Sequence, residues 1–491
     1  MGGSPQSTSP GGMERMKSDL VVIGAGIAGL VAANRAAELG LRVVVLEKGT
    51  EDRYLCNSRY TGGAFHIGMR SLNRPVEEVM DTIRSETDGF VEDALVTMLA
   101  TEAPRAVDWL RRQGIRFMKA GPRDWQDTVL APPALPQPGL NWEGRGGDTL
   151  LRTLGAALEK RGGSIHRGVR ARELMMEDGR CVGLRAERNG ETLMIEARGV
   201  VIADGGFQGD PELVRAHVSP VPEAVRQRGA GTGGGDGLRM AAAAGAALRG
   251  TPYVYGHILC QDALTNEKLW PYPWLDELVM AGLVVDRAGV RVVDEGRGGV
   301  HVTNRIAKLD DPLATTVIFD RPIWNGPGTE SIIPANPHLL RVGGTIVEAD
   351  TLEGLAEKLG IPADRLEATV AAYNAAVDAG DTAGLTPPRS TGRARPFPVR
   401  QGPFMAIRLV AGMTYTMGGI AIDDHGRVRR EDGTPIGGLF AAGATTGGLE
   451  GGDAIGYVGG LTKSSVTGLR AAEAAAAELG RAGSDGSGVE R

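Results

Sequence analysis

Residues 19–50 read DLVVIGAGIAGLVAANRAAELGLRVVVLEKGT, and this stretch decides the fold of the chain. An apolar run at 20–23 meets a glycine-rich turn, an alanine-rich segment and a second apolar run at 43–46. Short apolar runs rich in valine are typical of buried strands, and an alanine-rich segment between them is typical of a helix. The stretch therefore predicts a β-α-β unit.

The turn of this unit contains a phosphate-binding pattern, because Gly24, Gly26 and Gly29 form G-x-G-x-x-G between strand and helix. The first glycine permits a sharp turn, the second lets backbone approach a diphosphate, and the third lets helix and strand pack closely. The amides at the start of the helix stabilise phosphate charge. Glu47 ends the second strand, where a carboxylate can bind ribose hydroxyls and repel a 2′-phosphate. The unit therefore predicts a Rossmann-like domain for FAD or NAD and disfavours NADP.

The composition narrows the class of protein. A length of 491 residues exceeds what one hydrophobic core usually supports, so at least two domains are expected. Glycine occurs 74 times, about double its usual share of roughly 7%. The formal net charge of -6 argues against nucleic acid and anionic membranes as partners. Composition therefore favours small-molecule chemistry.

Cysteine usage and the chain ends bear on the compartment. Cys56, Cys181 and Cys260 are far apart, which suggests neither a disulfide framework nor a metal site and fits a reducing cytoplasm. The opening residues lack the apolar core of a signal peptide, and no apolar run reaches the roughly 18 residues of a membrane span. Met13 or Met16 could be the natural start. Residues 1–17 and 481–491 are polar and rich in glycine and serine, which predicts disorder.

Patterns along the chain predict two interleaved domains. Helices are expected between 75 and 112 and at 148–162, on either side of a proline-rich surface loop at 131–139, and a β-meander at 164–202. The glycine-dense character stops near 249 and returns after a proline-rich stretch at 386–400, with a last helix at about 462–479. We therefore expect an FAD or NAD domain from two segments, 18–248 and 402–480, with an inserted α+β capping domain at 249–401.

Five motifs in order choose FAD over NAD. They are GAGIAGL with Glu47-Lys48, NSRYTGG at 57–63, ADGGF at 203–207, GGGDGLRMAAAAGA at 234–247, and LFAAG at 439–443. With these motifs the chain resembles the FAD-dependent family of fumarate reductase and succinate dehydrogenase flavoproteins. Within that family the motifs are most similar to those of tricarballylate dehydrogenase and 3-ketosteroid Δ1-dehydrogenase. The resemblance implies an FAD-dependent oxidoreductase acting on CH–CH groups.

The turn and the resemblance together imply a set of cofactor-binding residues. Two of them depart from the family, which often has threonine at position 204 and glutamate at position 444. Gly459 and Gly460 precede the last helix and permit close approach to a planar ring, and the positive end of that helix could stabilise a reduced flavin. The expected set is Gly24, Gly26, Ala28, Gly29, Glu47, Lys48, Asn57, Ser58, Thr61, Gly62, Gly63, Val169, Ala203, Asp204, Gly205, Asp236, Gly418, Gly443, Ala444, Gly460 and Leu461.

The substrate positions depart from fumarate reductases. Those enzymes carry a histidine before a paired glycine and an arginine before a later one, whereas this chain has Tyr415 and Tyr457 there. A phenol offers one neutral hydrogen bond in place of a bidentate fork, so a ketone or mixed acid is favoured over a small dicarboxylate. Tyr457 is the leading residue to polarise the substrate. Tyr415 could be catalytic or could only pack beside the flavin.

Three further side chains are candidates for proton transfer or substrate contact. Arg297 and His301 follow a segment after which relatives often supply the proton-transferring residue, although a solvated loop is an alternative. His257 lies near where relatives carry a substrate-contacting histidine. Cys56 lies near a flavin-attachment position of relatives, but a free core residue is the simpler interpretation.

The favoured reaction is desaturation of a C–C bond next to a ketone or carboxylate, with hydride passing to flavin N5 and an external acceptor or oxygen removing the electrons. The alternatives are an ene-reductase running the other way, a flavin-dependent oxygenase, and a non-catalytic redox sensor.

Overall fold

The computed structural model describes residues 14–480, and the predictions for residues 1–13 and 481–491 lie outside this range. Strand β1 (Glu14–Ile23) already begins inside the expected leader. Its first residues pair in parallel with a later strand, from Glu14 opposite Leu193 to Ser18 opposite Ala197. The prediction of disorder is therefore wrong for residues 14–17, because long-range strand pairing orders them.

The predicted β-α-β unit is present. Helix α1 (Ile27–Glu38) follows β1, and β2 (Val43–Glu47) then pairs in parallel with β1, with Leu20 opposite Val43. All of β2 is buried, as expected of a parallel strand covered on both faces. The small side chains of α1 allow it to pack against the last helix, α13 (Gly460–Glu478).

The main sheet joins the two ends of the chain. Its strand order is β17-β18-β8-β1-β2-β5, with β7 and β6 continuing from β8, and β18 runs parallel to β8. Within 164–202, β6, β7 and β8 form the predicted meander, and its tight turns carry positive φ angles at Asp178-Gly179 and Asn189-Gly190. The first strand, β5, differs from the prediction, because it pairs in parallel with β2. The bounds are β5 Ser164–Arg167, β6 Val169–Glu177, β7 Arg180–Arg188, β8 Glu191–Ile202, β17 Arg427–Arg429 and β18 Pro435–Ala441.

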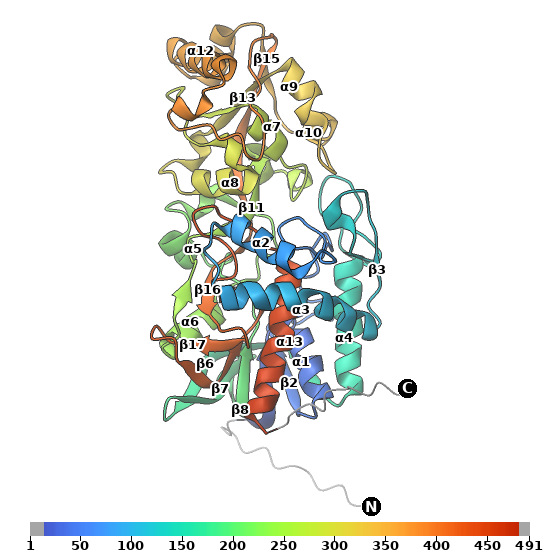
Figure 1. Ribbon diagram of the computed structural model, residues 1–491. Helices are drawn as coiled ribbons and strands as arrows, with labels where there is room; N and C mark the ends of the chain where they lie inside the picture. Colours follow the sequence, from blue (N-terminus) through green and yellow to red (C-terminus); the bar gives the residue numbers. More distant parts are fainter. Residues whose placement is uncertain (1–13, 481–491) are drawn as a thin grey trace, which may run out of the picture.

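Helices and short strands cover this sheet (Figure 1). The predicted helices are α2 (Val76–Thr87), α3 (Asp93–Arg112) and α4 (Gly146–Lys160), and the proline-rich segment between α3 and α4 is a loop, as expected. The remaining elements of this domain are α5 Pro211–His217, α6 Asp236–Ala243, β3 Phe117–Met118, β4 Val129–Leu130, β10 Leu248–Arg249, β16 Gly419–Ala421 and β19 Thr446–Gly447.

The cap is built on a second sheet, at the top of Figure 1. The sheet consists of β9 (Val225–Gln227), β11 (Val254–Cys260), β12 (Leu283–Val285), β13 (Thr316–Asp320), β14 (Val347–Ala349) and β15 (Phe404–Thr416). Because β15 pairs with β11 and β13, the cap sheet continues past the expected boundary at 401. Its helices are α7 Asp276–Ala281, α8 Gly299–Ala307, α9 Arg321–Asn325, α10 Ala335–Arg341, α11 Leu352–Leu359 and α12 Ala363–Ala379.

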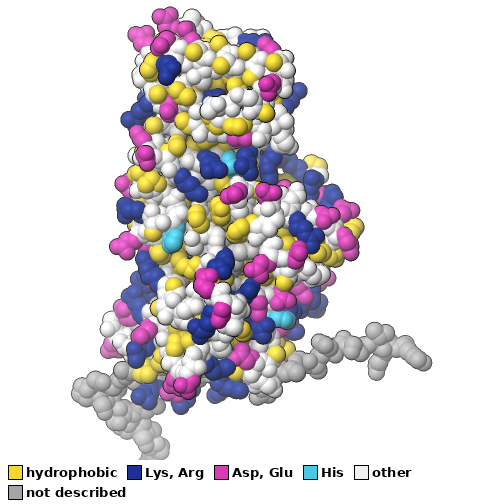
Figure 2. Space-filling model, turned by 60° about the vertical axis from the view of Figure 1, so that its left-hand side comes forward, with side chains coloured by type: hydrophobic (Ala, Val, Ile, Leu, Met, Phe, Trp, Pro, Cys, Tyr) yellow, Lys and Arg dark blue, Asp and Glu magenta, His cyan; other side chains and the backbone are white. Residues whose placement is uncertain are grey.

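Short 3-10 helices connect the elements, at Asp124–Gln126, Pro222–Ala224, Gln261–Leu264, Glu267–Leu269, Glu295–Arg297, Pro312–Ala314, Pro327–Thr329, Thr382–Gly384 and Gly443–Thr445. Most buried apolar side chains of both domains form one continuous core, and Tyr415, Met417 and Ile455 form a second, smaller cluster. On the face shown in Figure 2, acidic and basic side chains are interspersed over both domains. Within residues 14–480, no helix is both long and apolar enough to cross a bilayer.

Candidate active site

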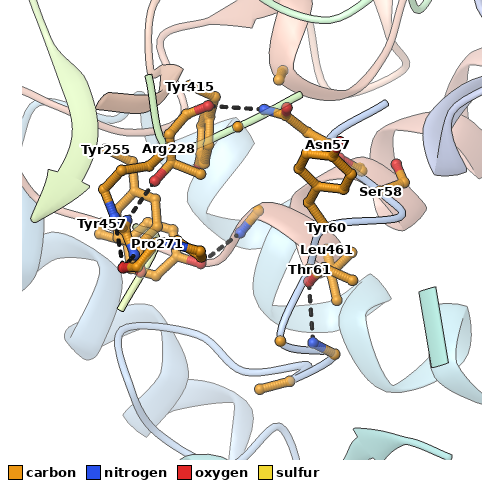
Figure 3. Close-up of a pocket in the computed structure, with 18 of the residues that line it drawn as sticks. Asn57, Ser58, Tyr60, Thr61, Arg228, Tyr255, Pro271, Tyr415, Tyr457 and Leu461 are labelled. Carbon is orange, nitrogen blue, oxygen red and sulfur yellow. Dashed lines mark hydrogen bonds between the residues drawn. The ribbon is translucent and has the colours of Figure 1, made fainter. Parts of the chain in front are cut away.

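A cavity of about 730 Å³ lies between the two domains. Its lining comes from the β1–α1 turn, the segment after β2, strands β11 and β15, and the start of α13. Figure 3 shows Tyr255, Tyr415, Tyr457 and Arg228 on one side of it and the segment from Asn57 to Thr61 on the other. Segments distant in sequence therefore meet around one space.

The glycines of the turn have distinct roles. Gly24 has φ +98°, and a Cβ there would lie 2.5 Å from the carbonyl oxygen of Ala203, so only glycine fits. A Cβ on Gly29 would lie 1.9 Å from the carbonyl oxygen of Gly24, so this residue permits helix–strand contact and does not line the cavity. The amide of Ile27, at the start of α1, donates to Ser58 Oγ at 3.0 Å. The positive end of α1 therefore faces the cavity wall.

Glu47 lines the cavity and also supports the turn. Its carboxylate accepts the amide of Ala25 at 3.1 Å and that of Gly49 at 2.7 Å. Burial raises the pKa of this carboxyl, and the two amides oppose the shift. Each oxygen keeps lone-pair capacity for a ribose hydroxyl.

Asp204 supplies an observation that fits a bound polyol chain. One oxygen of its carboxyl accepts the amide of Gly237 at 2.8 Å, at the start of α6. The other is buried and has no hydrogen-bond partner among the described residues. Burial raises the pKa of Asp204 to about 6. Asp236 differs, because Arg170 binds it through two hydrogen bonds of 2.7 and 2.8 Å.

The NSRYTGG segment forms the wall opposite the tyrosines. Asn57 donates to the carbonyl oxygen of Thr414 and accepts the amide of Ala230, both at 2.8 Å. Thr61 Oγ1 accepts the amide of Gly63 at 3.1 Å. This wall is therefore tied to strand β15 of the cap sheet.

Most of the expected cofactor residues line the cavity. Gly418 does not, because it packs on Gly250, where a Cβ would lie 2.0 Å from backbone. Gly443 does not either, because it lies against Ala28. Those that line it are Gly24, Gly26, Ala28, Glu47, Lys48, Asn57, Ser58, Thr61, Gly62, Gly63, Val169, Ala203, Asp204, Gly205, Asp236, Ala444, Gly460 and Leu461.

A buried ion pair that sequence reasoning missed anchors the start of α13. Lys463 Nζ lies 2.6 Å from Glu450 Oε2, and both side chains are fully buried. Glu450 also accepts the amides of Val458 and Gly459 and, at 2.8 Å, the hydroxyl of Tyr415. The available signal in the sequence was that Glu450 and Lys463 are two of only three charged residues in the glycine-rich stretch 446–463.

Tyr457 lies beside the N-terminus of α13. Its hydroxyl oxygen accepts the amide of Gly460 at 3.2 Å, and burial raises its pKa, so the hydroxyl stays protonated and can donate. Its ring stacks on Tyr255, with centroids 3.8 Å apart and planes 17° apart. Tyr415 lies 5.5 Å from Tyr255, centroid to centroid. The two predicted tyrosines therefore meet a third, from β11, that was not predicted.

The predicted histidines have different environments. Both ring nitrogens of His257 are engaged, Nδ1 with Asp276 at 2.6 Å and Nε2 with the hydroxyl of Tyr255 at 3.0 Å. His301 is buried, and its Nδ1 has no partner within the described part of the chain. Burial, assisted by Arg297, lowers the pKa of His301 to about 4, so the ring is neutral at pH 7.

Two further predicted side chains line the cavity. Arg297 donates to the carbonyl oxygen of Asp453 at 3.3 Å. Cys56 is a free thiol, and burial raises its pKa to about 11. The thiol is therefore protonated at pH 7 and a weak nucleophile.

Comparison with known proteins defines the family. The FAD binding domain family model matches residues 19–456. The chain is 30% identical to an NADH:acrylate oxidoreductase of Vibrio harveyi over 74% of this chain, and it spans 35% of that protein's length. It is 26% identical to a 4-oxocyclohexanecarboxylate 2-dehydrogenase of Sinomonas cyclohexanicum, over 91% of this chain and 90% of that protein.

A solved structure shares the fold. A 3-ketosteroid Δ1-dehydrogenase from Sterolibacterium denitrificans superposes with a TM-score of 0.71 at 21% identity, covering 94% of this chain and 99% of that chain. The predicted family, the α/β fold with its cap, and FAD as cofactor are thereby confirmed. The chain belongs to the FAD binding domain family, as a member of its FAD-dependent oxidoreductases.

Proposed function

We propose that this protein is an FAD-dependent dehydrogenase that forms a C=C bond next to the carbonyl group of an organic substrate. The observation that carries the proposal is the position of Tyr457 at the start of α13. Its hydroxyl accepts the Gly460 amide, which strengthens its own donation to a substrate carbonyl. When bound, FAD supplies the hydride acceptor. Tyr457 orients the carbonyl and stabilises the negative charge that develops on its oxygen.

The rim of the cavity favours an apolar substrate body. Within residues 14–480, seven large hydrophobic side chains are exposed, and five of them line this cavity. Clustered exposed apolar side chains are typical of a binding site. The five are Leu55, Met69, Met118, Leu135 and Ile332.

Arg228 favours a substrate that also carries an acid group. This guanidinium is 6% exposed, lines the cavity, and lies 5.7 Å from the ring centroid of Tyr272 and 5.9 Å from that of Trp274. It donates to the carbonyl oxygen of Pro271 and to Thr414 Oγ1, but it has no ion pair with an acidic residue in the range 14–480. A buried cation without a counter-ion favours an anionic ligand. A cyclic keto acid, as named for the Sinomonas relative, meets both requirements.

The reverse reaction, reduction of an activated C=C bond, is the second candidate, and the Vibrio relative, an acrylate oxidoreductase by name, favours it. The same residues would serve it, with an external donor in place of the external acceptor. Three free cysteines agree with the cytoplasm as the compartment that we propose.

Anaerobic mixing of the holoenzyme with 4-oxocyclohexanecarboxylate tests the proposal, with flavin absorbance as the readout. We expect bleaching with the wild type, and in Tyr457→Phe a rate lower by about 10²–10³-fold with FAD content unchanged. Tyr253→Phe is the matched control, because Tyr253 lies outside the cavity lining. Undiminished flavin reduction in Tyr457→Phe would remove this residue from the reaction.

A further inference from the structure

We propose that Tyr255 exchanges the proton at the substrate's α-carbon. His257 and Asp276 position the Tyr255 hydroxyl and act as a relay that carries its proton away. The proposal rests on the function proposed above and adds the residue that handles the proton. It is carried by a hydrogen-bonded chain from the cavity into the cap: Tyr255 hydroxyl to His257 Nε2, 3.0 Å, and His257 Nδ1 to Asp276 Oδ2, 2.6 Å.

The network assigns the direction of each hydrogen bond. Asp276 Oδ1 accepts the amide of Ile258 at 3.0 Å, so the carboxylate is an acceptor from two N–H groups. His257 then carries its proton on Nδ1, which leaves the lone pair of Nε2 to accept the hydroxyl of Tyr255. The chain is therefore set to draw a proton away from the cavity, as a carboxylate-backed histidine does for a hydroxyl nucleophile.

The fold holds this chain rigidly. Tyr255 and His257 are two residues apart on β11, so their side chains leave the same face of the strand. The register with β15 shifts between Tyr255 and Gly256, and the extra residue, Thr414, lies on β15, so the alternation of side chains along β11 is kept. His257 stacks on Trp274 at 4.0 Å, and Gly299 leaves room for Asp276, because a Cβ there would lie 2.0 Å from its carboxylate. Rigid support of this kind is typical of functional groups.

Tyr255 is the most exposed member of the chain. All three residues line the cavity, but Tyr255 is only partly buried, whereas His257 and Asp276 are each 8% exposed. Its ring is stacked on that of Tyr457. A carbonyl oxygen held by Tyr457 therefore brings the neighbouring α-carbon beside Tyr255.

The proton balance of the step is complete. The Cα–H bond breaks as its proton passes to the Tyr255 oxygen, while the hydroxyl proton passes to His257 Nε2. The Cβ–H bond breaks with its electron pair, a hydride that the oxidised flavin accepts, and the C=C bond forms. The imidazolium is stabilised by Asp276 until its proton reaches water. Reduction of a C=C bond would run the same transfers backwards.

The ionisation states agree with this sequence. Burial raises the pKa of Tyr255 well above its ordinary value, so a free phenolate is inaccessible and the hydroxyl needs an acceptor. Burial lowers the pKa of His257 against the opposing effect of Asp276, so the acceptor starts neutral. Charged and titratable groups that act on the relay are Arg228, Tyr272 and Tyr457.

Tyr415 lacks this capacity, although it occupies the same cluster. Its hydroxyl donates to Glu450, whose carboxylate already accepts two amides and the Lys463 ammonium. Four donors occupy the roughly four lone-pair sites of a carboxylate, so Tyr415 has no acceptor with spare capacity behind it.

The test measures exchange of α-hydrogens of 4-oxocyclohexanecarboxylate for deuterium in D₂O, by NMR, with the oxidised holoenzyme under anaerobic conditions. This readout reports proton transfer separately from flavin reduction. In Tyr255→Phe we expect the rates of exchange and of flavin reduction to be at least about 100-fold lower than in the wild type. FAD content and the spectral titration with this probe should stay as in the wild type. Tyr253→Phe should match the wild type.

His257→Gln and Asp276→Asn test the positioning roles. We expect each to slow exchange by about tenfold to 100-fold. The rate depends on neutral His257 and therefore falls at low pH, and Asp276→Asn should move this acid limb to lower pH because the carboxylate that favours the imidazolium is lost. A purely structural role would leave the limb in place.

Two outcomes separate the proposals. If the wild type reduces its flavin and Tyr255→Phe shows the same rates of deuterium exchange and flavin reduction as the wild type, the relay is overturned and the dehydrogenase proposal stands. Neither exchange nor flavin reduction in the wild type, despite a spectral titration showing that the probe binds, would overturn the dehydrogenase proposal itself.

Discussion

The two ends of the cavity are built by different means. The cofactor end, residues 24–29 with Glu47, is a local unit formed by glycines, backbone amides and one carboxylate. The substrate end, Arg228 with Tyr255, Tyr415 and Tyr457, consists of side chains from four distant segments. The first end depends on backbone conformation and the second on tertiary packing, so mutations should separate them.

The largest effect is expected at the cofactor end. Gly24→Ala places a methyl group against the Ala203 carbonyl at positive φ, whereas Gly40→Ala, also at positive φ, has nothing within 4 Å of the new methyl. The control should lose about 1–2 kcal/mol of stability and keep its FAD. Gly24→Ala should be purified without yellow colour. The FAD-to-protein ratio and urea unfolding measure both, and equal behaviour of the two variants would refute the close-packed turn.

The joint between the ends should show the next largest effect. Lys463→Met leaves the Glu450 carboxylate buried without its cation, which should cost about 3–5 kcal/mol of unfolding free energy. Lys17 pairs with Glu196 at the surface, with 73% of its side chain exposed, so Lys17→Met should stay within about 1 kcal/mol. Denaturant unfolding of both variants decides the matter, and a similar cost for both would contradict a structural role for the buried pair.

A pH effect should distinguish the aspartate at the cofactor end. The pKa of Asp204 in the folded protein is raised from 3.8 to about 6, so the folded state binds this proton more tightly than the unfolded state. The resulting stability is present below pH 3.8 and is lost as pH rises through about 6.

In the FAD-free wild type, the unfolding free energy should therefore fall by at most about 3 kcal/mol between pH 4 and pH 7 on account of Asp204. Asp204→Asn should not show this fall. Thermal unfolding across this range gives the measurement, with the exposed Asp88→Asn as control. Parallel pH profiles for Asp204→Asn and the wild type would count against a protonated Asp204.

The smallest of these effects is expected from Arg228, at the substrate end. Arg228→Met should weaken binding of cyclohexanecarboxylate about tenfold, the loss of one charge-assisted contact, and leave cyclohexanone binding and FAD content unchanged. Titrations followed through the flavin spectrum measure both probes, with Arg239→Met, a surface variant, as control. An equal loss for the acid and the ketone would show that Arg228 only supports the fold.

The sequence alone determined the β-α-β unit, the FAD-binding family, the β6-β7-β8 meander and the long helices, since glycine turns, hydrophobic periodicity and helix spacing are local properties. It also indicated Tyr457 and Tyr415, through departures from a familiar motif. In the meander, the positive φ angles of the Asn189-Gly190 turn follow from the Asn-Gly dipeptide itself.

Only the tertiary structure decided which side chains meet. The strand at 14–17 is ordered by pairing with residues near 194, and the cap sheet extends through β15 because that strand has partners on both sides. Tyr255 stacks on Tyr457 at one side of the cavity, and Glu450 binds Lys463 in the protein interior, and no local pattern encodes either contact. Contacts of this kind form only when separate elements pack, since burial and hydrogen bonding assign a role to a side chain after its neighbours are in place.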